Sequence, residues 1–412
     1  MKTLLLFTLC LCFSSISLSQ PTAIPDSNFE QALIDLGYDS GTIDGSVPTA
    51  NINTITDLSI NSKNIADLTG IEDFIALEIL WCVNNDISSL DVSNLTALSV
   101  LNCDRNDITS IDLSNNTALT SLKILANDLT SLDVTNNTLL EYLSCSANNL
   151  TSLNVSNNTA LAYLALHNND VASIDISNNS LLYFLGCSFT GVTALDTSNN
   201  LNLKDLQCND SSLSHLDISN NNLLEVISCR NNQLTTLNID NNVLLEELHC
   251  EGNNIIDLDL SNNAAILVLN CQGNQLTSLN LKNGNNTSIS EFGASDNANL
   301  LCIEVEDAAY STANWTDIDS QTGFSEDCSA LSTNEFNLNS SISVYPNPVT
   351  TELNITLKNN QAITSIELFN MLGKKIVTTK ALNLDVSPYQ SGIYILKVST
   401  KEGQISKRII IE

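Results

Sequence analysis

The chain of 412 residues carries 46 acidic and 15 basic side chains, which gives a formal net charge of −31 at pH 7. Nucleic acids bind to basic surfaces, so this charge argues against DNA or RNA as a partner. Hydrophobic residues make up 43% of the chain, which is typical of a folded protein, and the length leaves room for two or three domains.

Residues 1–19 are predicted to be a secretory signal peptide. Lys2 precedes a short apolar run, and Ser17 and Ser19 offer small residues for cleavage. The run is too short to span a bilayer, and no later segment is apolar enough to do so. We therefore expect an exported protein that is not an integral membrane protein.

Residues 20–54 are predicted to form an N-terminal cap. Asp26 and Ser27 can cap a short helix that presents Phe29, Ala32 and Leu33 on one face and ends near Gly37. Its apolar face would cover the open end of the repeats that follow.

Residues 55–300 are predicted to be a repeat domain. One apolar position returns every 21 residues, at Leu77, Leu98, Leu119, Leu140, Leu161, Leu182, Leu203, Leu224, Leu245 and Ile266. Such a strict period indicates stacked coils. Within one unit, the alternation of Leu101 and Cys103 predicts a short strand with one buried face, which would pair in parallel with the next coil.

The unit resembles bacterial leucine-rich repeats. It reads LSVLNCDRNDITSIDLSNNTA from Leu98, and its first half matches the pattern LxxLxLxxNxL with cysteine in the third apolar position. This resemblance implies an α/β leucine-rich repeat solenoid, mostly of β coils with a short N-terminal cap helix. It also implies an architecture similar to that of the internalins.

Polar columns accompany the leucines. Two asparagine columns, which include Asn106 and Asn116, are expected to satisfy backbone groups at the bends of the coils, and Thr190 and Ser211 interrupt the first column. An aspartate recurs once per coil, at Asp91, Asp112, Asp133, Asp175, Asp196, Asp217 and Asp259. These carboxylates indicate either a solvated acidic surface or a calcium site. We favour the first, so no cofactor or metal is predicted, because calcium takes more oxygens than one carboxylate per coil provides.

The twelve cysteines fall into three groups. Cys10 and Cys12 belong to the signal peptide. Eight others share one inward position and are expected to pack as small free hydrophobes rather than as disulfides or metal ligands: Cys82, Cys103, Cys145, Cys187, Cys208, Cys229, Cys250 and Cys271. Cys302 and Cys328 are predicted to form a disulfide that closes a C-terminal cap, residues 301–328.

After a linker at residues 329–341, the sequence changes to short alternating strands. The sequence predicts a small all-β, immunoglobulin-like sandwich over residues 342–412. Its motifs resemble those of the type A sorting domain of the type IX secretion system of Bacteroidota; they include Tyr345, Pro346, Asn347, Pro348, Gly373, Gly392, Tyr394 and Lys407. The resemblance implies recognition by the secretion machinery, passage through the periplasm, and release or display at the cell surface.

No catalytic motif is present in the sequence, and the three histidines fall in different coils or positions, so we do not expect an enzyme. A candidate ligand site lies on the outward side of the strands, where Tyr142, Tyr163 and Phe184 stand in consecutive coils, with His167, Phe189 and Trp81 as further members. Aromatic patches serve recognition, although a ladder that only stabilises the strands explains the pattern equally well.

We therefore predict a secreted or surface-displayed binding protein for an extracellular protein. A polysaccharide-binding surface protein and a structural envelope component without a ligand are the alternatives.

Overall fold

The computed structural model describes residues 21–328, 342–357, 363–371, 373–400 and 404–412. The chain divides into two compact units, residues 1–326 and 327–412. The predicted signal peptide, 1–19, and the predicted linker, 329–341, lie outside the described residues.

The N-terminal cap contains the predicted helix. α1 (Ser27–Asp35) begins after Asp26, whose Oδ1 accepts hydrogen bonds from the amides of Asn28 and Phe29. The second carboxylate oxygen of Asp26 accepts from the amides of Ala66 and Asp67, so one side chain caps the helix and ties it to the first coil. The antiparallel strands β1 (Pro21–Ala23) and β2 (Ser46–Pro48) and the helix α2 (Thr49–Ile52) complete the cap.

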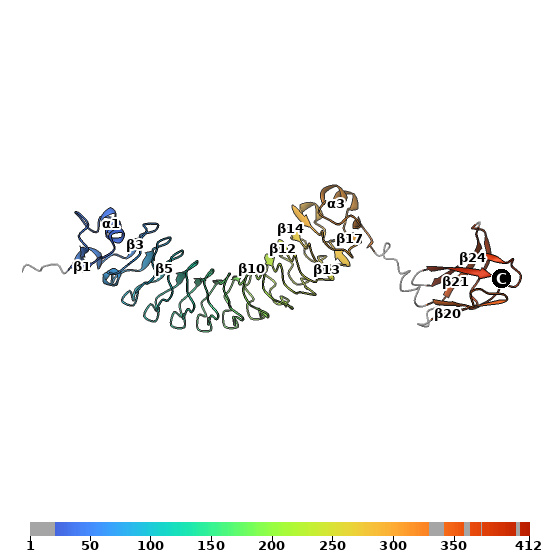
Figure 1. The fold of residues 1–412 in the computed structure, drawn as a ribbon, viewed down its shortest axis with the longest axis horizontal. Coiled ribbons are helices and arrows are strands. Elements are labelled where there is room, and N and C mark those ends of the chain that lie inside the picture. Colours follow the sequence, from blue (N-terminus) through green and yellow to red (C-terminus); the bar gives the residue numbers. More distant parts are fainter. Residues whose placement is uncertain (1–20, 329–341, 358–362, 372, 401–403) are drawn as a thin grey trace, which may run out of the picture. The chain divides into compact units, whose positions relative to one another are not determined.

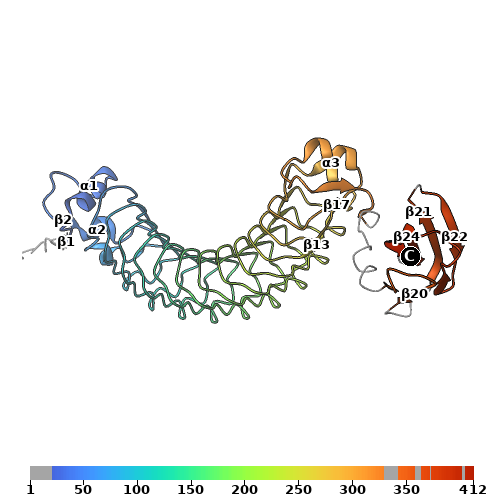
Figure 2. The same cartoon turned by 45° about the vertical axis from the view of Figure 1, so that its right-hand side comes forward.

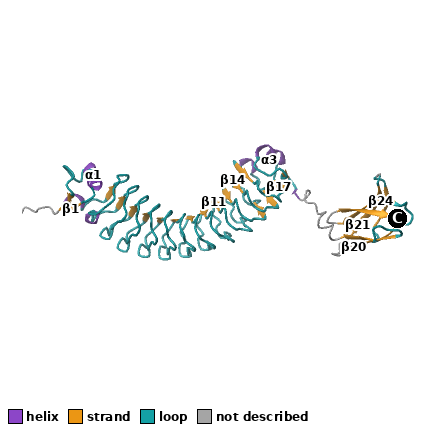
Figure 3. Ribbon diagram, viewed as in Figure 1, coloured by secondary structure: helices purple, strands orange, loops and turns teal. Residues whose placement is uncertain are grey.

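The solenoid is built on one parallel sheet of twelve three-residue strands. From Ile79 to Val268, each coil places its strand beside the next in the register that the 21-residue period predicts, so that Leu101 pairs with Leu122 and Leu122 with Leu143. Figures 1, 2 and 3 show the solenoid as an arc, with the sheet along its inner side and loops along its outer side. The strands of this sheet are β3 (Asp57–Ser59), β4 (Ile79–Trp81), β5 (Val100–Asn102), β6 (Ser121–Lys123), β7 (Tyr142–Ser144), β8 (Tyr163–Ala165), β9 (Phe184–Gly186), β10 (Asp205–Gln207), β11 (Val226–Ser228), β12 (Glu247–His249), β14 (Val268–Asn270) and β16 (Glu291–Gly293).

The predicted leucine and cysteine columns fill the core. The eight repeat cysteines are free and buried, as the sequence predicts. Desolvation raises the pKa of Cys82 and of Cys145 to about 12, which keeps them as thiols at neutral pH. They therefore act as small apolar side chains.

The first asparagine column is a hydrogen-bonded ladder. Asn106 Nδ2 donates to the carbonyls of Cys82 and Cys103, both at 3.0 Å, and its Oδ1 accepts from the amide of Ile87 at 3.1 Å. Each such amide thereby joins its own coil to the preceding one. At the interruption, among the backbone groups that the structure describes, Thr190 Oγ1 donates to the carbonyl of Cys187 alone. The strands nevertheless continue in register there.

The residue before each position of this asparagine column adopts the left-handed conformation, including Phe189 before Thr190 and Asp210 before Ser211. The column runs through residues of very different kinds, all with positive φ: Asn84, Arg105, Ala126, Ala147, Asn168, Phe189, Asp210, Asn231, Gly252, Gly273 and Asp296. The backbone turn is thus dictated by the stacked coils and not by the residue at the turn.

The other side of the coils carries the aspartate column and a short second sheet. Asp112 Oδ1 accepts from the amide of Ser114 at 2.9 Å, and the other aspartates of the column make the same turn. The hydrogen bonds from the side chain and then the backbone of Ser114 lower the pKa of Asp112. The sheet contains β13 (Asp257–Asp259), β15 (Ser278–Asn280), β17 (Cys302–Glu304) and β18 (Gly323–Ser325). The 3-10 turns η1 (Ile71–Asp73) and η2 (Asn286–Ser288) lie in the connections.

The C-terminal end of the solenoid is closed by aromatic packing. Trp315 follows helix α3 (Ala308–Asn314) and stacks on Phe292 with ring centroids 4.5 Å apart. Cys302 and Cys328 are both disulfide-bonded, as the sequence predicts.

The C-terminal unit contains two antiparallel sheets around a separate core that includes Leu353, Ile366 and Leu396. One sheet holds β19 (Ile342–Tyr345), β20 (Glu352–Leu357) and β23 (Asn383–Asp385). The other holds β21 (Ile363–Asn370), β22 (Lys375–Thr379), β24 (Gly392–Thr400) and β25 (Gln404–Ile411). The all-β prediction is confirmed, and the immunoglobulin-like topology stays a prediction.

The tyrosine-proline motif of this unit is tied to the last strand. Asn347 Nδ2 donates to the carbonyl of Arg408, and Asn347 Oδ1 accepts from the amide of Ile410, both at 2.8 Å. Gly373 adopts a positive φ of 76° in the turn between β21 and β22. The Tyr394 hydroxyl donates to the carbonyl of Gln390. Asn347, Gly373 and Tyr394, which belong to three of the predicted motifs, therefore stabilise turns and strand ends of one small domain.

Candidate functional site

The three predicted aromatic residues form one stack on the inner sheet. Tyr142, Tyr163 and Phe184 pair across β7, β8 and β9. The rings of Tyr142 and Tyr163 lie 4.1 Å apart and are inclined by 5°, and those of Tyr163 and Phe184 lie 4.3 Å apart and are inclined by 6°. We call these three residues the aromatic ladder.

The aromatic ladder is less exposed than the sequence suggests. All three side chains are half-buried rather than free in water, because each ring covers a face of its neighbour. Burial and the hydrogen bond with Tyr142 raise the pKa of Tyr163 and keep its phenol protonated. The stacking therefore stabilises the strands and leaves mainly the ring edges in contact with solvent.

A cation closes the N-terminal end of the ladder. Lys123 Nζ lies 4.9 Å from the ring centroid of Tyr142 and 6.0 Å from that of Trp81. Both distances are within the range of a cation–π interaction. Trp81 is thereby connected to the aromatic ladder through Lys123, although two strands, β5 and β6, lie between it and Tyr142.

A groove of about 550 Å3 runs beside the ladder. We call it the recognition groove, and its lining includes Tyr142, Tyr163, His167, Phe189 and Asn209. The ring of His167 lies edge-on to Phe184 with centroids 6.4 Å apart, and its Nδ1 accepts from the amide of Ser188. Burial lowers the pKa of His167, so its imidazole is neutral at pH 7.

Gly186 makes this arrangement possible, and sequence reasoning missed it. A Cβ at this position would collide with the imidazole of His167 and come within 3.0 Å of Phe184. The signal in the sequence is faint: glycine is the smallest residue in its column, between Ala165 and Gln207.

Phe189 is the most unusual member of the site. It has a φ of 55° and leaves 54% of its surface exposed. A large aromatic residue in the left-handed region is strained, and in the other coils the same turn is made by asparagine, glycine, aspartate, alanine or arginine. The protein therefore keeps the exposed ring of Phe189 at a cost in folding stability.

A second polar cluster lies on the same sheet, on the C-terminal side of the ladder. Arg230 Nε lies 3.4 Å from Glu251 Oε1, and an Arg230 guanidinium nitrogen lies 2.8 Å from His249 Nδ1. Glu247 Oε2 lies 3.7 Å from His249 Nε2. These groups form a network of charged side chains, in which Arg230 Nε and Glu251 Oε2 are buried without a hydrogen-bond partner among the described residues.

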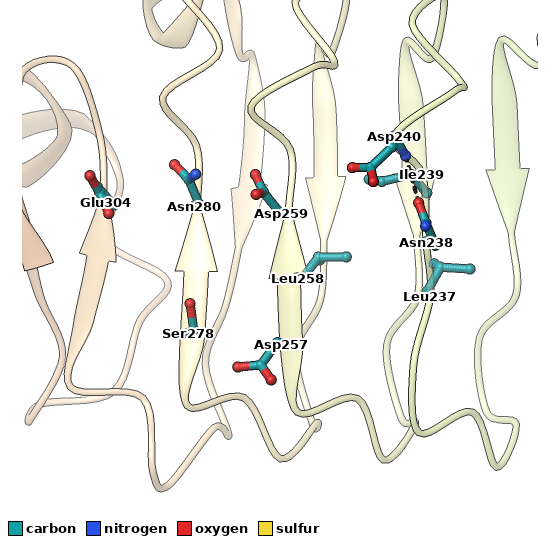
Figure 4. Close-up of a pocket in the computed structure, with 10 residues that line it drawn as sticks. All are labelled: Leu237, Asn238, Ile239, Asp240, Asp257, Leu258, Asp259, Ser278, Asn280 and Glu304. Carbon is teal, nitrogen blue, oxygen red and sulfur yellow. Dashed lines mark hydrogen bonds between the residues drawn. The ribbon is translucent and has the colours of Figure 1, made fainter. Parts of the chain in front are cut away.

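A second hollow lies on the outer sheet and is acidic. It has a volume of about 420 Å3 and includes Asp240, Asp257, Asp259 and Glu304 in its lining. Figure 4 shows Asp259, Asn280 and Glu304 at corresponding places on three neighbouring strands. Within the described ranges, no group of three or more histidine, cysteine, aspartate or glutamate side chains is arranged to hold a metal ion. That the aspartate column is a solvated acidic surface rather than a calcium site stays a prediction.

Comparisons with known proteins give matches to the C-terminal unit and to the solenoid. Residues 343–412 match the family model described as the secretion system C-terminal sorting domain. These residues are a type IX sorting domain. The chain is therefore exported to the cell surface or beyond, and the presence of this domain implies a Bacteroidota source. A search of curated proteins finds no match.

Solved structures establish the fold of the solenoid. The functional domain of InlJ from Listeria monocytogenes, which includes a cysteine ladder, is 24% identical with a TM-score of 0.65, over 96% of this chain and 99% of that one. An internalin, InlF, of the same organism is 21% identical with a TM-score of 0.59, over 76% and 99%. A leucine-rich repeat protein of Leptospira interrogans is 18% identical with a TM-score of 0.51, over 67% and 85%. The solenoid thus has an internalin-like leucine-rich repeat fold.

The helices that the structure describes are all too short or too polar to cross a bilayer.

Proposed function

We propose that this secreted leucine-rich repeat protein is a non-enzymatic recognition protein whose solenoid binds an extracellular protein at the aromatic ladder and the recognition groove. The sorting domain serves export and the solenoid serves binding. The three histidines stand apart in the coils, and His167 and His249 are held by neighbouring groups, which supports a role without catalysis.

The observation that carries the proposal is Phe189. Its ring is exposed beside the groove while its backbone is strained. Side chains that are exposed and costly to keep are typical of functional sites. An aromatic anchor of this kind provides a large contact area with little loss of side-chain entropy.

The stacking favours a protein partner over a polysaccharide. Sugar rings bind aromatic residues by lying flat on an open ring face. In the aromatic ladder, both faces of Tyr163 are covered by its neighbours, and the outer face of Tyr142 is covered by Lys123. Ring edges and a concave groove suit the side chains of a protein better than the flat faces of a glycan.

The test uses Phe189→Asn in the full chain. Asparagine suits the left-handed turn, so the variant is expected to be at least as stable as the wild type while it loses the anchor. Asp296→Asn, at the same turn in a coil remote from the groove, is the matched control. Protein partners captured from whole cells should bind Phe189→Asn about tenfold or more weakly, because anchors commonly contribute 2 kcal/mol or more.

A glycan array is probed with the same three proteins. Equal capture of protein partners by the variant and the control would reject the proposed site. Binding to glycans that depends on Phe189 would support the polysaccharide alternative. Absence of any ligand in both assays would favour a structural envelope component.

A further inference from the structure

The aromatic ladder has two different ends. Tyr142, Tyr163, Phe184 and Asp205 occupy one position on four successive strands, and Asp205 pairs directly with Phe184. Because the rings stack along the direction in which the strands succeed one another, Asp205 takes the next place in the stack. Tyr163 covers one face of Phe184, and the strand pairing places Asp205 on the side of the other face.

A carboxylate is a poor neighbour for this ring face. The π face of an aromatic ring carries partial negative charge, so it attracts cations and repels anions. At the N-terminal end the chain supplies the favourable partner, Lys123, over Tyr142. At the C-terminal end it supplies a negative group instead.

No cation from the described residues pairs with Asp205. Lys204 Nζ binds Glu225 Oε1 at 2.7 Å, and Arg230 is engaged with Glu251 and His249. Asp205 is instead held by Gln207, whose Nε2 donates to both carboxylate oxygens at 3.2 Å. Burial, followed by the charge of Glu247, raises the pKa of Asp205. The carboxylate is thus positioned and partly desolvated without a compensating positive charge.

We propose that the outer face of Phe184 and the carboxylate of Asp205 together form a subsite for an arginine side chain of the protein partner. This inference rests on the proposed function, because it names the chemistry of the partner at the same surface. A guanidinium lying on Phe184 would place its positive charge against the ring and its N–H groups against the carboxylate. It would repeat, at the C-terminal end of the ladder, the contact that Lys123 makes at the other end.

Arginine suits the subsite better than lysine does. A guanidinium is planar, so it can stack on the ring while two parallel N–H groups reach the two oxygens of one carboxylate. Gln207 already holds those two oxygens in a fixed orientation. The ammonium of lysine is more strongly hydrated and cannot make the bidentate contact.

The test titrates the full-chain protein with Nα-acetyl-arginine amide and with the citrulline analogue, which has nearly the same shape but no charge. Binding is followed by NMR of the protein labelled at phenylalanine, with the Phe184 signal assigned by its loss in Phe184→Leu. Arginine amide should shift the Phe184 signal, with a dissociation constant at least about threefold lower than that of the citrulline analogue. Asp205→Asn should remove that preference, whereas Glu225→Gln, a carboxylate that already pairs with Lys204, should retain it.

Equal binding of the two probes, or no binding of either, would overturn the arginine subsite. An arginine preference that survives in Asp205→Asn would also overturn it. In each of these three cases, capture of protein partners by the wild type and not by Phe189→Asn would leave the proposed function intact, so failure of the subsite and failure of the proposed function are distinguishable.

Discussion

Replacing Asn106 with serine should show how much the asparagine ladder contributes to stability. The change removes the acceptor of the Ile87 amide and at least one of the donors to the carbonyls of Cys82 and Cys103. A buried amide left without an acceptor costs about 1–3 kcal/mol, and each lost hydrogen bond costs about 0.5–1.5 kcal/mol. We expect the free energy of unfolding to fall by about 2–4 kcal/mol.

The interruption of the ladder allows the reverse experiment. Ser211 stands where other coils have asparagine, and within the described part of the chain the buried amide of Val192, which such an asparagine would bind, has no hydrogen-bond partner. Ser211→Asn should therefore restore the missing contacts and raise the free energy of unfolding by about 1–2 kcal/mol.

Urea denaturation monitored by tryptophan fluorescence measures both changes. The chain has two tryptophans, Trp81 and Trp315, and both lie in the solenoid unit. Asn115→Ser is the matched control, because Asn115 is exposed and donates one hydrogen bond, to the carbonyl of Ser93. If Asn106→Ser costs no more than Asn115→Ser, or if Ser211→Asn lowers stability, the ladder does not hold the coils together as we argue.

Three further predictions concern the thiols, the carboxylate of Asp205 and the sorting domain. The mature protein should titrate eight free thiols after denaturation and few in the native state, because the repeat cysteines are buried with a raised pKa; fewer than four free thiols would reject the packing role. Asp205→Asn should raise the melting temperature at pH 7. Folding raises the pKa of the Asp205 carboxyl, so the folded protein loses stability as pH rises through the folded-state pKa and Asp205 ionises. The difference in melting temperature between variant and wild type should vanish below the unfolded pKa of about 3.9, and a constant difference across pH would contradict this cause. Removal of residues 342–412 should leave a folded solenoid that is not exported, which fractionation of cells would detect, and normal export would refute the role of the domain.

The 21-residue period predicted most of the solenoid because each coil repeats the same register. If the side chain of Leu101 points into the core, the side chains of its neighbours Val100 and Asn102 must point away from the core, onto the surface along the inner side of the arc. The same holds for Tyr142, Tyr163 and Phe184. Parallel pairing in register therefore brings together residues 21 positions apart without any further information. The sorting domain was predictable for a different reason, namely several specific motifs in order.

Other features depended on contacts that the period does not encode. The left-handed column contains asparagine, alanine, arginine and phenylalanine, so no residue type marks it, and the strain at Phe189 could not be predicted. The half-buried state of the aromatic ladder depends on side-chain torsions that let the rings lie parallel. The role of Gly186 becomes apparent only when the ring of His167 is in place.

The central claim is that a protein partner contacts the inner surface at the recognition groove, and site-specific photo-crosslinking tests it most directly. A benzophenone analogue of phenylalanine would replace Phe189 in one full-chain protein and Leu139, which is 53% exposed and lies outside the groove lining, in another. We predict that the probe at position 189 crosslinks a specific protein on whole cells and that the probe at position 139 does not. Crosslinking of the same protein from position 139 alone, or equally from both, would contradict recognition through this surface.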